Sequence, residues 1–306
     1  MKIYHYLPGL IACLILTISA QAQNKSGADS TGLPGDNFSL QGALAMFQKA
    51  SSPEDFEKLL NSENNHVNNL DLNNDGEIDY IRVIDNSDKN AHAFVLQAIV
   101  SGTESQDIAV IEIEKTGDTT AVLQIIGDED IYGEQVIVEP GDEGGEEAFI
   151  NNNSDNSNRI AHGPNAVYDN PNPRIIVNVW YWPSVRFVYA PVYRPWISPW
   201  RWRHYPGWWR PWGPFVWRVW HPFHRPYYAH CAIVQTHRVV YAHRIYTPLR
   251  VTSVAVRTRH ATALGNYRVT RTKTIITGPR GHGATRTRTT ITTPSGNRTK
   301  ATVRRH

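Results

Sequence analysis

The sequence predicts an α+β domain, in which two short helices cover an antiparallel sheet, followed by a basic, aromatic C-terminal region that is β-rich or partly disordered. Three observations support this prediction. Apolar residues recur at helical spacing between residues 38 and 61. They alternate with polar residues, or form short apolar runs, between residues 78 and 139. The acidic residues end at Asp169, whereas most basic residues and all ten Trp follow it.

The two halves of the 306-residue chain carry opposite charge. Residues 1–169 contain all 28 Asp and Glu but only eight Lys and Arg, which gives a net charge of −20. Residues 170–306 contain the other 23 Lys and Arg and no acid, so the overall charge of +3 conceals the division. Such an asymmetry predicts polyanion binding, membrane-surface binding, or pairing between the two halves.

Residues 1–22 have the pattern of a secretory signal peptide: one lysine, an apolar run, and Ala20-Gln21-Ala22 as a cleavage site. We therefore expect export across the inner membrane, to the periplasm, the outer membrane surface or the medium. Leu10–Cys13 also fits a bacterial lipoprotein signal, although few apolar residues precede the cysteine. After cleavage only Cys231 remains, so no intramolecular disulfide is expected, and no later stretch is apolar enough for a membrane helix.

Two helices are predicted after a Gly/Ser/Asp-rich leader over residues 23–37, which we expect to be flexible. The first lies in FSLQGALAMFQKA (residues 38–50) and the second in SSPEDFEKLLN (residues 51–61). Ser52 before Pro53 is a favourable helix start, because its hydroxyl accepts a free backbone N–H and acidic residues follow in the first turn.

Five strands are predicted next, in IDYIRVID, HAFVLQAIV, DIAVIEIE, TAVLQIIG and QVIVE, with a hairpin turn at residues 115–118. Together with the helices they complete an acidic domain over residues 38–150. Glu112 and Glu114 alternate with apolar residues, and we interpret them as the solvated face of their strand.

Oxygen-bearing side chains recur at alternate positions of DLNNDGEID, with Gly76 available for a sharp turn. This stretch resembles EF-hand-type calcium loops. Because a strand follows it and Arg82 occupies the twelfth position, it is more similar to the D-x-N-x-D-G-x-x-D loops of calcium-binding β-repeat proteins. The resemblance implies a structural calcium site, binding on the order of 10⁻⁴ to 10⁻³ M. Its ligands would be Asp71, Asn73, Asp75, Glu77 (through its carbonyl) and Asp79. The alternative is an Asn/Asp-rich turn that binds no metal.

A linker rich in Gly, Asn and Pro is expected over residues 151–173, followed by a basic region over residues 174–264. All ten Trp lie between Trp180 and Trp220. RIIVNVWYW and RFVYAPVY predict strands, whereas the repeated polar-Pro-Trp units of residues 194–212 favour turns or polyproline II.

Rings beside guanidinium groups suit an anionic glycan, a lipid head group or a nucleic acid. The candidate residues are Arg194, Arg201, Arg203, Arg210, Trp196, Trp200, Trp202 and Trp212. The alternative is that the Trp side chains pack against one another or against the acidic domain, because ten exposed indoles would favour aggregation.

A Thr-rich repeat forms the tail, residues 265–306. TRTKTIITGPRGHGA, from Thr270, is echoed fifteen residues later by TRTRTTITTPSGNRT. Each unit predicts a strand and a turn, with its cations on one face. Unless a polyanion or the acidic domain lies along them, we expect this tail to be disordered. The cations concerned are Arg271, Lys273, Arg286 and Arg288.

No catalytic motif is evident, so we do not expect an enzyme. His221 and His224 have a spacing that a transition metal can use, but histidine in such sequence more often serves as another aromatic polar residue. The layout resembles secreted proteins of Gram-negative environmental and gut bacteria, which implies no particular activity. We expect a cell-envelope binding or structural protein in which a calcium-stabilised acidic module carries a polyanion-binding region. The alternatives are self-assembly through the opposite charges and, less favoured, an envelope hydrolase.

Overall fold

The computed structural model describes residues 30–141, 176–277, 283–293 and 296–305, with side chains as far as Tyr267. The expected signal peptide and linker lie outside these residues. Residues 30–37, which we assigned to a flexible leader, instead include a short 3-10 helix, η2 (Pro34–Asn37). The Asp36 carboxylate accepts hydrogen bonds from Thr31 and Gly32, and Leu33 packs against Tyr267. Residues 30–37 therefore form defined structure ahead of the first predicted helix.

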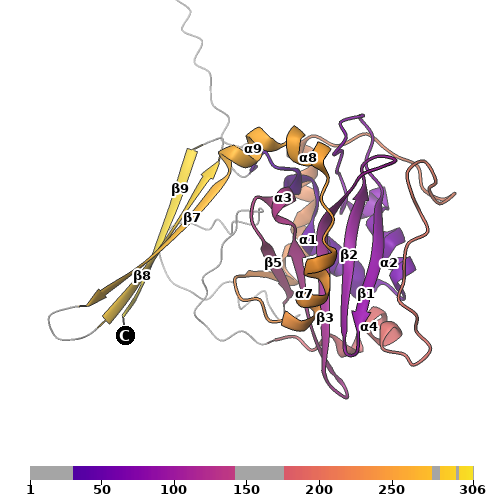
Figure 1. Ribbon diagram of the computed structural model, residues 1–306, viewed down its shortest axis with the longest axis horizontal. Coiled ribbons are helices and arrows are strands. Elements are labelled where there is room, and N and C mark those ends of the chain that lie inside the picture. Colours follow the sequence, from indigo (N-terminus) through magenta and orange to yellow (C-terminus); the bar gives the residue numbers. More distant parts are fainter. Residues whose placement is uncertain (1–29, 142–175, 278–282, 294–295, 306) are drawn as a thin grey trace, which may run out of the picture.

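A six-stranded antiparallel sheet, in the order β1-β2-β3-β4-β5-β6, forms the centre of the molecule, and the protein is α+β as expected (Figure 1). Five strands follow the predicted ones closely. The sixth, β6, comes from the basic half and pairs with β5 through Ile137–Val234 to Pro140–Cys231. The strands are β1 (Ile81–Asp88), β2 (Ala91–Ile99), β3 (Ser105–Gly117), β4 (Thr120–Gly127), β5 (Val136–Pro140) and β6 (Cys231–Val234).

The two predicted helices are confirmed as α1 (Leu40–Lys49) and α2 (Pro53–Leu60), and both lie on one face of the sheet. Each begins with a serine cap. The Ser39 hydroxyl accepts from Gly42 N at 3.0 Å and the Ser52 hydroxyl from Asp55 N at 3.1 Å. A third helical turn, α3 (Glu129–Tyr132), joins β4 to β5, and η3 (Glu63–Asn65) follows α2.

The two strands predicted in RIIVNVWYW and RFVYAPVY are wrong. Residues 179–188 instead form η4 (Val179–Tyr181) and α4 (Pro183–Val188). Pro183 explains the difference, because it removes a ladder donor and has the φ that suits the first turn of a helix. Val179 and Val185 are fully buried in the core that α1 and α2 form with the sheet.

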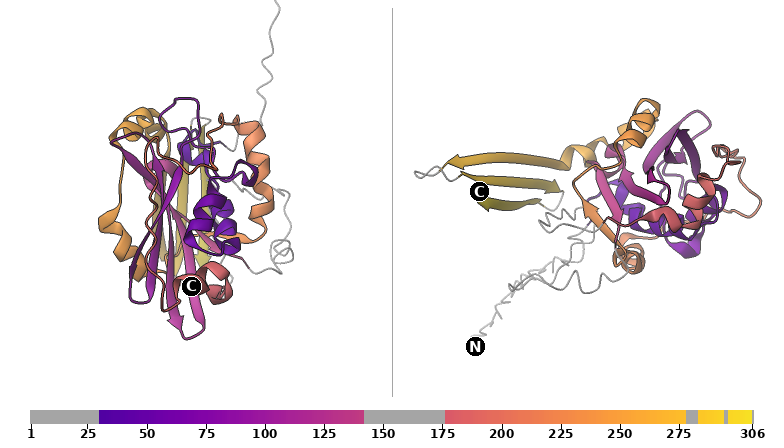
Figure 2. Two further views of the ribbon diagram at one scale, coloured as in Figure 1. Left: turned by 90° about the vertical axis from the view of Figure 1, so that its right-hand side faces the viewer. Right: turned by 90° about the horizontal axis from the view of Figure 1, so that it is seen from below.

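The basic half covers both faces of the sheet, which lies edge-on in the left panel of Figure 2. Residues 189–216 contain no helix or strand, as the polar-Pro-Trp repeats predicted. After them, α7 lies on the face opposite α1 and α2, where Tyr246 packs against Val95 and Val110. The helices of this part are α5 (Trp217–Trp220), η5 (His221–His224), α6 (Arg225–Tyr228), α7 (Val240–Tyr246), η6 (Thr247–Leu249), α8 (Val254–Arg259) and α9 (Ala261–Asn266).

A second antiparallel sheet of three strands follows α9 and projects from the main body (Figure 1). Its strands are β7 (Arg268–Thr277), β8 (Gly283–Thr293) and β9 (Gly296–Arg305). The register places Arg271 opposite Thr289 and Arg286 opposite Thr274. Across the described residues, no helix combines the length and the apolarity needed to cross a membrane.

Candidate functional site

The predicted calcium loop connects η3 to β1 and is held by hydrogen bonds between its own side chains and backbone. The Asp71 carboxylate accepts from Asp75 N at 3.1 Å and from Gly76 N at 3.0 Å, and Asp75 Oδ1 accepts from Glu77 N at 2.9 Å. Asn74 and Gly76 have positive φ, at 59° and 84°. A metal-free Asx turn and a cation-binding loop share these contacts, so a calcium titration is the measurement that separates them.

Asp79 is the buried member of this loop. Its carboxylate is 4% exposed and accepts from Leu72 N at 2.6 Å, and it also lies 3.4 Å from Asn73 Nδ2. Burial, together with the nearby charges of Asp71 and Asp75, raises the pKa of Asp79 to about 8. The Arg259 guanidinium, which donates to Leu72 O, acts in the opposite direction. Ionisation of Asp79 beside Asp71 and Asp75 is therefore unfavourable, and a cation bound between these carboxylates would lower its free-energy cost.

The structure brings the Trp-rich stretch directly onto this loop. Ile78 N donates to Trp212 O at 2.9 Å, and Trp209 is buried against Tyr80, just before β1. The predicted cation loop and the predicted polyanion-binding residues are therefore adjacent, although more than 100 residues separate them in the sequence. The half-buried side chains around Trp209 are Trp200, Trp202, Tyr205 and Trp212.

The tryptophans mainly serve as packing groups. Trp180, Trp209 and Trp220 are buried, six others are half-buried, and of the ten only Trp208 is exposed, at 47%. Trp196 illustrates their role: it packs against the main core and its Nε1 donates to Glu57 at 3.4 Å. The full or partial burial of nine of the ten favours the alternative weighed from the sequence, that these rings pack against one another or against the acidic domain.

The four candidate arginines of this stretch remain on the surface. Arg194, Arg201, Arg203 and Arg210 are exposed, and no carboxylate of the described residues lies within 4.0 Å of them. Arg210 donates to two carbonyl oxygens of its own turn, those of Gly207 and Trp209. We call residues 194–210 the arginine loop. The other predicted cations, Arg271, Lys273, Arg286 and Arg288, lie on β7 and β8, where side chains are outside the description.

Further along the chain, cations are paired with the acidic half. Seven of the eight ion pairs among the described residues join the two halves. Arg250 reaches Asp128 at 2.5 Å and Asp130 at 3.0 Å, and Arg257 reaches Asp130 at 2.9 Å. Arg238 pairs with Glu139 at 2.9 Å. We call residues 237–257 the pairing segment.

The interpretation of Glu112 and Glu114 as a solvated strand face is wrong. Glu112 is fully buried, because the pairing segment covers this face of β3. The backbone N–H groups of Tyr241 and Ala242, in the first turn of α7, donate to Glu114 Oε1 at 2.5 and 3.0 Å. These N–H groups have no partner within the helix, so the carboxylate satisfies them.

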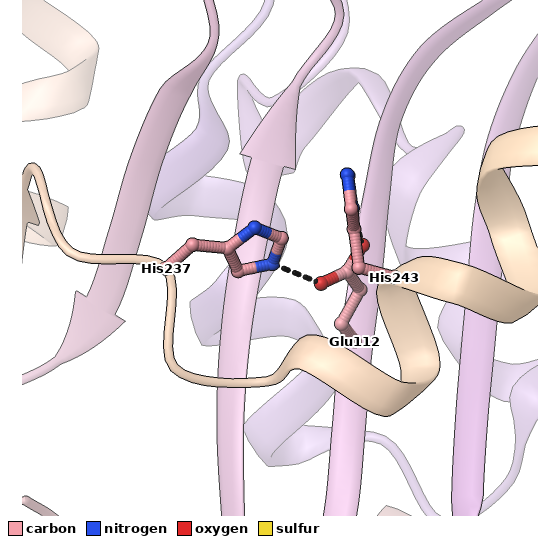
Figure 3. A group of neighbouring side chains, drawn as sticks. All are labelled: Glu112, His237 and His243. Carbon is pink, nitrogen blue, oxygen red and sulfur yellow. Dashed lines mark hydrogen bonds and ion pairs between the residues drawn. The ribbon is translucent and has the colours of Figure 1, made fainter.

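Both oxygens of Glu112 contact a histidine, and Figure 3 shows the one to His237 as a dashed line, with His243 beside the carboxylate. His237 Nε2 lies 2.6 Å from Oε2, and His243 Nδ1 lies 2.7 Å from Oε1. The two imidazole rings are 4.2 Å apart at an angle of 78°. Among the described residues, these three form the one group of His, Cys, Asp or Glu whose ligand atoms all lie within 4.8 Å of one another. The sequence offered one signal for them, the echo of HRVVYA by HRIYTP, but nothing that linked it to Glu112.

His221 and His224, the pair with metal-like spacing, lie elsewhere and pack as aromatic side chains. His221 lies 4.6 Å from the Trp217 ring, and His224 packs edge-on to Trp220 at 4.8 Å. Burial lowers the pKa of His224 to about 3, so this imidazole is neutral over the physiological range.

Comparison with known proteins adds no family or function: the chain matches no family model, and neither curated proteins nor solved structures show a detectable similarity to it.

Proposed function

We propose that this protein is a cell-envelope binding protein that holds an anionic polymer on its arginine loop and its C-terminal sheet. The single observation that carries the proposal is the division of the cations into two sets. Arg238, Arg250 and Arg257 of the pairing segment contact carboxylates, whereas the four arginines of the arginine loop face solvent with no described carboxylate beside them. Cations without a carboxylate partner attract a polyanion, because binding one does not break an existing ion pair.

An anionic glycan is the polymer that this surface suits best. Guanidinium groups bind carboxylate or sulfate in a bidentate manner, and the exposed ring of Trp208 offers a face for a sugar. Arg203 also lies beside the half-buried ring of Trp202, with 5.9 Å between the guanidinium carbon and the ring centroid. The expected export of the chain supports an envelope glycan over a nucleic acid.

Calcium belongs to this proposal as a structural ion at residues 71–79. The backbone of the loop packs against Trp212 and the aromatic cluster under the arginine loop. An ion that fixes the loop therefore also stabilises the platform that carries the arginines.

The alternative of self-assembly through opposite charges receives support only in its intrachain form. The carboxylates that it requires, among them Asp128 and Glu139, already contact arginines of the same chain. Pairing between chains would have to break these contacts first.

Binding of the full-length chain to immobilised polygalacturonate, over a series of salt concentrations, tests the proposal. We expect log K to fall linearly with log salt, as counterion release requires. Changing the four loop arginines to Gln (Arg194, Arg201, Arg203 and Arg210) is expected to weaken binding at least about tenfold. The matched control changes four cations elsewhere on the surface to Gln (Lys49, Arg186, Arg225 and Arg244) and is expected to retain most of the affinity.

Three results would overturn the proposal. Binding of dextran by the parent protein as tightly as polygalacturonate would remove the role of charge. Equal losses in both quadruple variants would show that net charge, rather than the arginine loop, is responsible. Preferential binding of double-stranded DNA or of anionic lipid vesicles would replace the glycan with a different class of partner.

A further inference from the structure

The cluster of Glu112, His237 and His243 brings three ligand-bearing side chains to one point from three separate elements. Glu112 belongs to β3, His237 to the loop between β6 and α7, and His243 to α7. The glutamate side chain is 0% exposed, while those of His237 and His243 are 22% and 25% exposed. The site thus has a buried carboxylate at its base and two imidazoles at its rim, which leaves a route from solvent.

We propose that Glu112, His237 and His243 bind a divalent transition-metal ion, and that Zn²⁺ fits them best. Imidazole nitrogen and carboxylate oxygen are ligands that zinc commonly uses, and two histidines with one carboxylate leave a fourth position for water. A carboxylate buried in this way needs a compensating positive charge, which the metal ion supplies.

The geometry needs only a small adjustment to admit the ion. Zinc with bonds of about 2.0–2.2 Å in tetrahedral geometry holds its ligand atoms about 3.3 Å apart. The contacts of 2.6 and 2.7 Å must therefore lengthen by less than about 1 Å. Both imidazoles are partly exposed and can rotate to do so, whereas Glu112 is fixed in the sheet.

The surrounding contacts hold the ligands in place before any ion binds. On one side of His237, Arg238 pairs with Glu139 and its backbone N–H donates to Gln124 at 2.7 Å. On the other side, the first turn of α7 is fixed to Glu114. Neighbouring charges are therefore already paired with groups other than Glu112. Such preorganisation by surrounding groups is what a metal site requires to orient its ligands.

A metal ion bound at this site therefore links the two halves of the chain. Glu112 belongs to the acidic half and both histidines to the pairing segment, so the ion ties that segment to the face of the sheet it covers. This inference does not rest on the polymer-binding proposal, because the arginine loop contributes none of the ligands.

Zinc binding to the full-length chain, after removal of metals with a chelator, tests the inference. Isothermal titration calorimetry with Zn²⁺ alone, near neutral pH, is expected to show one tight site per chain. Zinc is also expected to raise the melting temperature, because a ligand that binds only the folded state stabilises it. Calcium at the same concentration is expected to do neither, since hard cations prefer oxygen ligands.

A double variant, His237→Gln with His243→Gln, is expected to weaken this binding at least about 100-fold and to abolish the zinc-dependent rise in melting temperature. Gln keeps an amide donor for Glu112, so the fold should persist, and circular dichroism in chelator checks this. The matched control, His204→Gln with His230→Gln, changes two exposed histidines and is expected to behave as the parent. The inference would be overturned if both double variants bound zinc with equal affinity. It would also be overturned if zinc left the melting temperature of the parent unchanged.

Discussion

Glu57 accepts hydrogen bonds from both halves of the chain, although only 2% of it is exposed. Its carboxylate takes the hydroxyl of Tyr80 at 2.8 Å and the N–H of Val83 at 2.8 Å from the acidic half, and the hydroxyl of Ser198 at 2.9 Å from the basic half. Burial raises the pKa of Glu57, while these donors partly offset that effect. At the scale of single residues, buried carboxylates are the points to which the basic half attaches.

The residue scale also decides whether the loop at residues 71–79 binds calcium. With calcium at about ten times its dissociation constant, the folded state gains about 1.4 kcal/mol. A gain of that size raises the melting temperature of a chain of this length by about 3–5 °C. We expect this rise in the parent and its loss in Asp75→Ala, because Asp75 is both a predicted ligand and the partner of Glu77 N.

Thermal unfolding with and without about 10 mM calcium, followed by circular dichroism, provides the measurement. Asp118→Ala is the matched control, because Asp118 is an exposed acid in the turn between β3 and β4. It should retain the full calcium-dependent rise. If Asp75→Ala retains it as well, or if the parent lacks it, the loop is a metal-free turn.

At the scale of elements, the sequence correctly predicted those helices and strands whose apolar residues follow a regular local period. The helices α1 and α2 and the strands β1 to β5 each carry their own apolar period, and the serine caps are local signals too. The error at residues 179–188 arose because Val, Trp and Tyr favour strands, whereas Pro183 and burial against α1 favour a helical turn.

The missed site has a different cause, which is distance along the chain. The alternation around Glu112 correctly separates two faces of β3, but it cannot tell what covers each face. The covering histidines follow 125 and 131 residues later. Glu112 was therefore taken for a solvated residue, and the pair His237 and His243 had no visible partner.

Asp107 gives the contact between β3 and the pairing segment a pH dependence. Its carboxylate, fully buried, accepts from Val251 N at 2.8 Å and from the Tyr246 hydroxyl at 3.1 Å. Burial raises the pKa of Asp107 to about 6 from an ordinary value of 3.8, so the folded state holds this proton more tightly than the unfolded state. The stability that this proton provides is complete below pH 3.8 and is lost as the pH rises to about 6.

We therefore expect the parent to lose up to about 1.4 kcal/mol of unfolding free energy per pH unit across this window, relative to Asp107→Asn. The total change in the difference is about 3 kcal/mol. Urea unfolding of both proteins between about pH 4 and pH 7 measures it, with Asp118→Asn as an exposed control. A difference that stays constant with pH, or that grows as the pH rises, would contradict the argument.

At the scale of the whole molecule, the two oppositely charged halves are joined by a shared sheet, a shared core and several ion pairs. The basic half contributes β6 to the sheet, buries Trp180, Val185 and Cys231 in the main core, and pairs arginines with Asp128, just after β4, and Glu139, on β5. A core shared in this way makes the folding of each half depend on the other. The four arginines of the arginine loop are a group of exposed cations, close together in the sequence, that have no carboxylate partner among the described residues.

This dependence predicts that neither half folds alone. A fragment of residues 24–150 lacks the groups that cover β5 and the face of β3 on which Glu112 lies, and so it exposes apolar surface and unpaired carboxylates. We expect fragments 24–150 and 174–306 to unfold without a cooperative transition when separate, and an equimolar mixture to regain one. The measurement is thermal unfolding followed by near-ultraviolet circular dichroism.

Salt separates the two contributions to this reassembly. In about 1 M NaCl, where the Debye length is about 3 Å, partly exposed ion pairs such as Arg257–Asp130 are screened. The burial of Val179, Trp180 and Val185 is not weakened by salt, because it depends on removing apolar surface from water. High salt should therefore lower the stability of the reassembled pair without preventing its formation. A 24–150 fragment that melts cooperatively within a few degrees of the full chain would show instead that the acidic half is an independent domain.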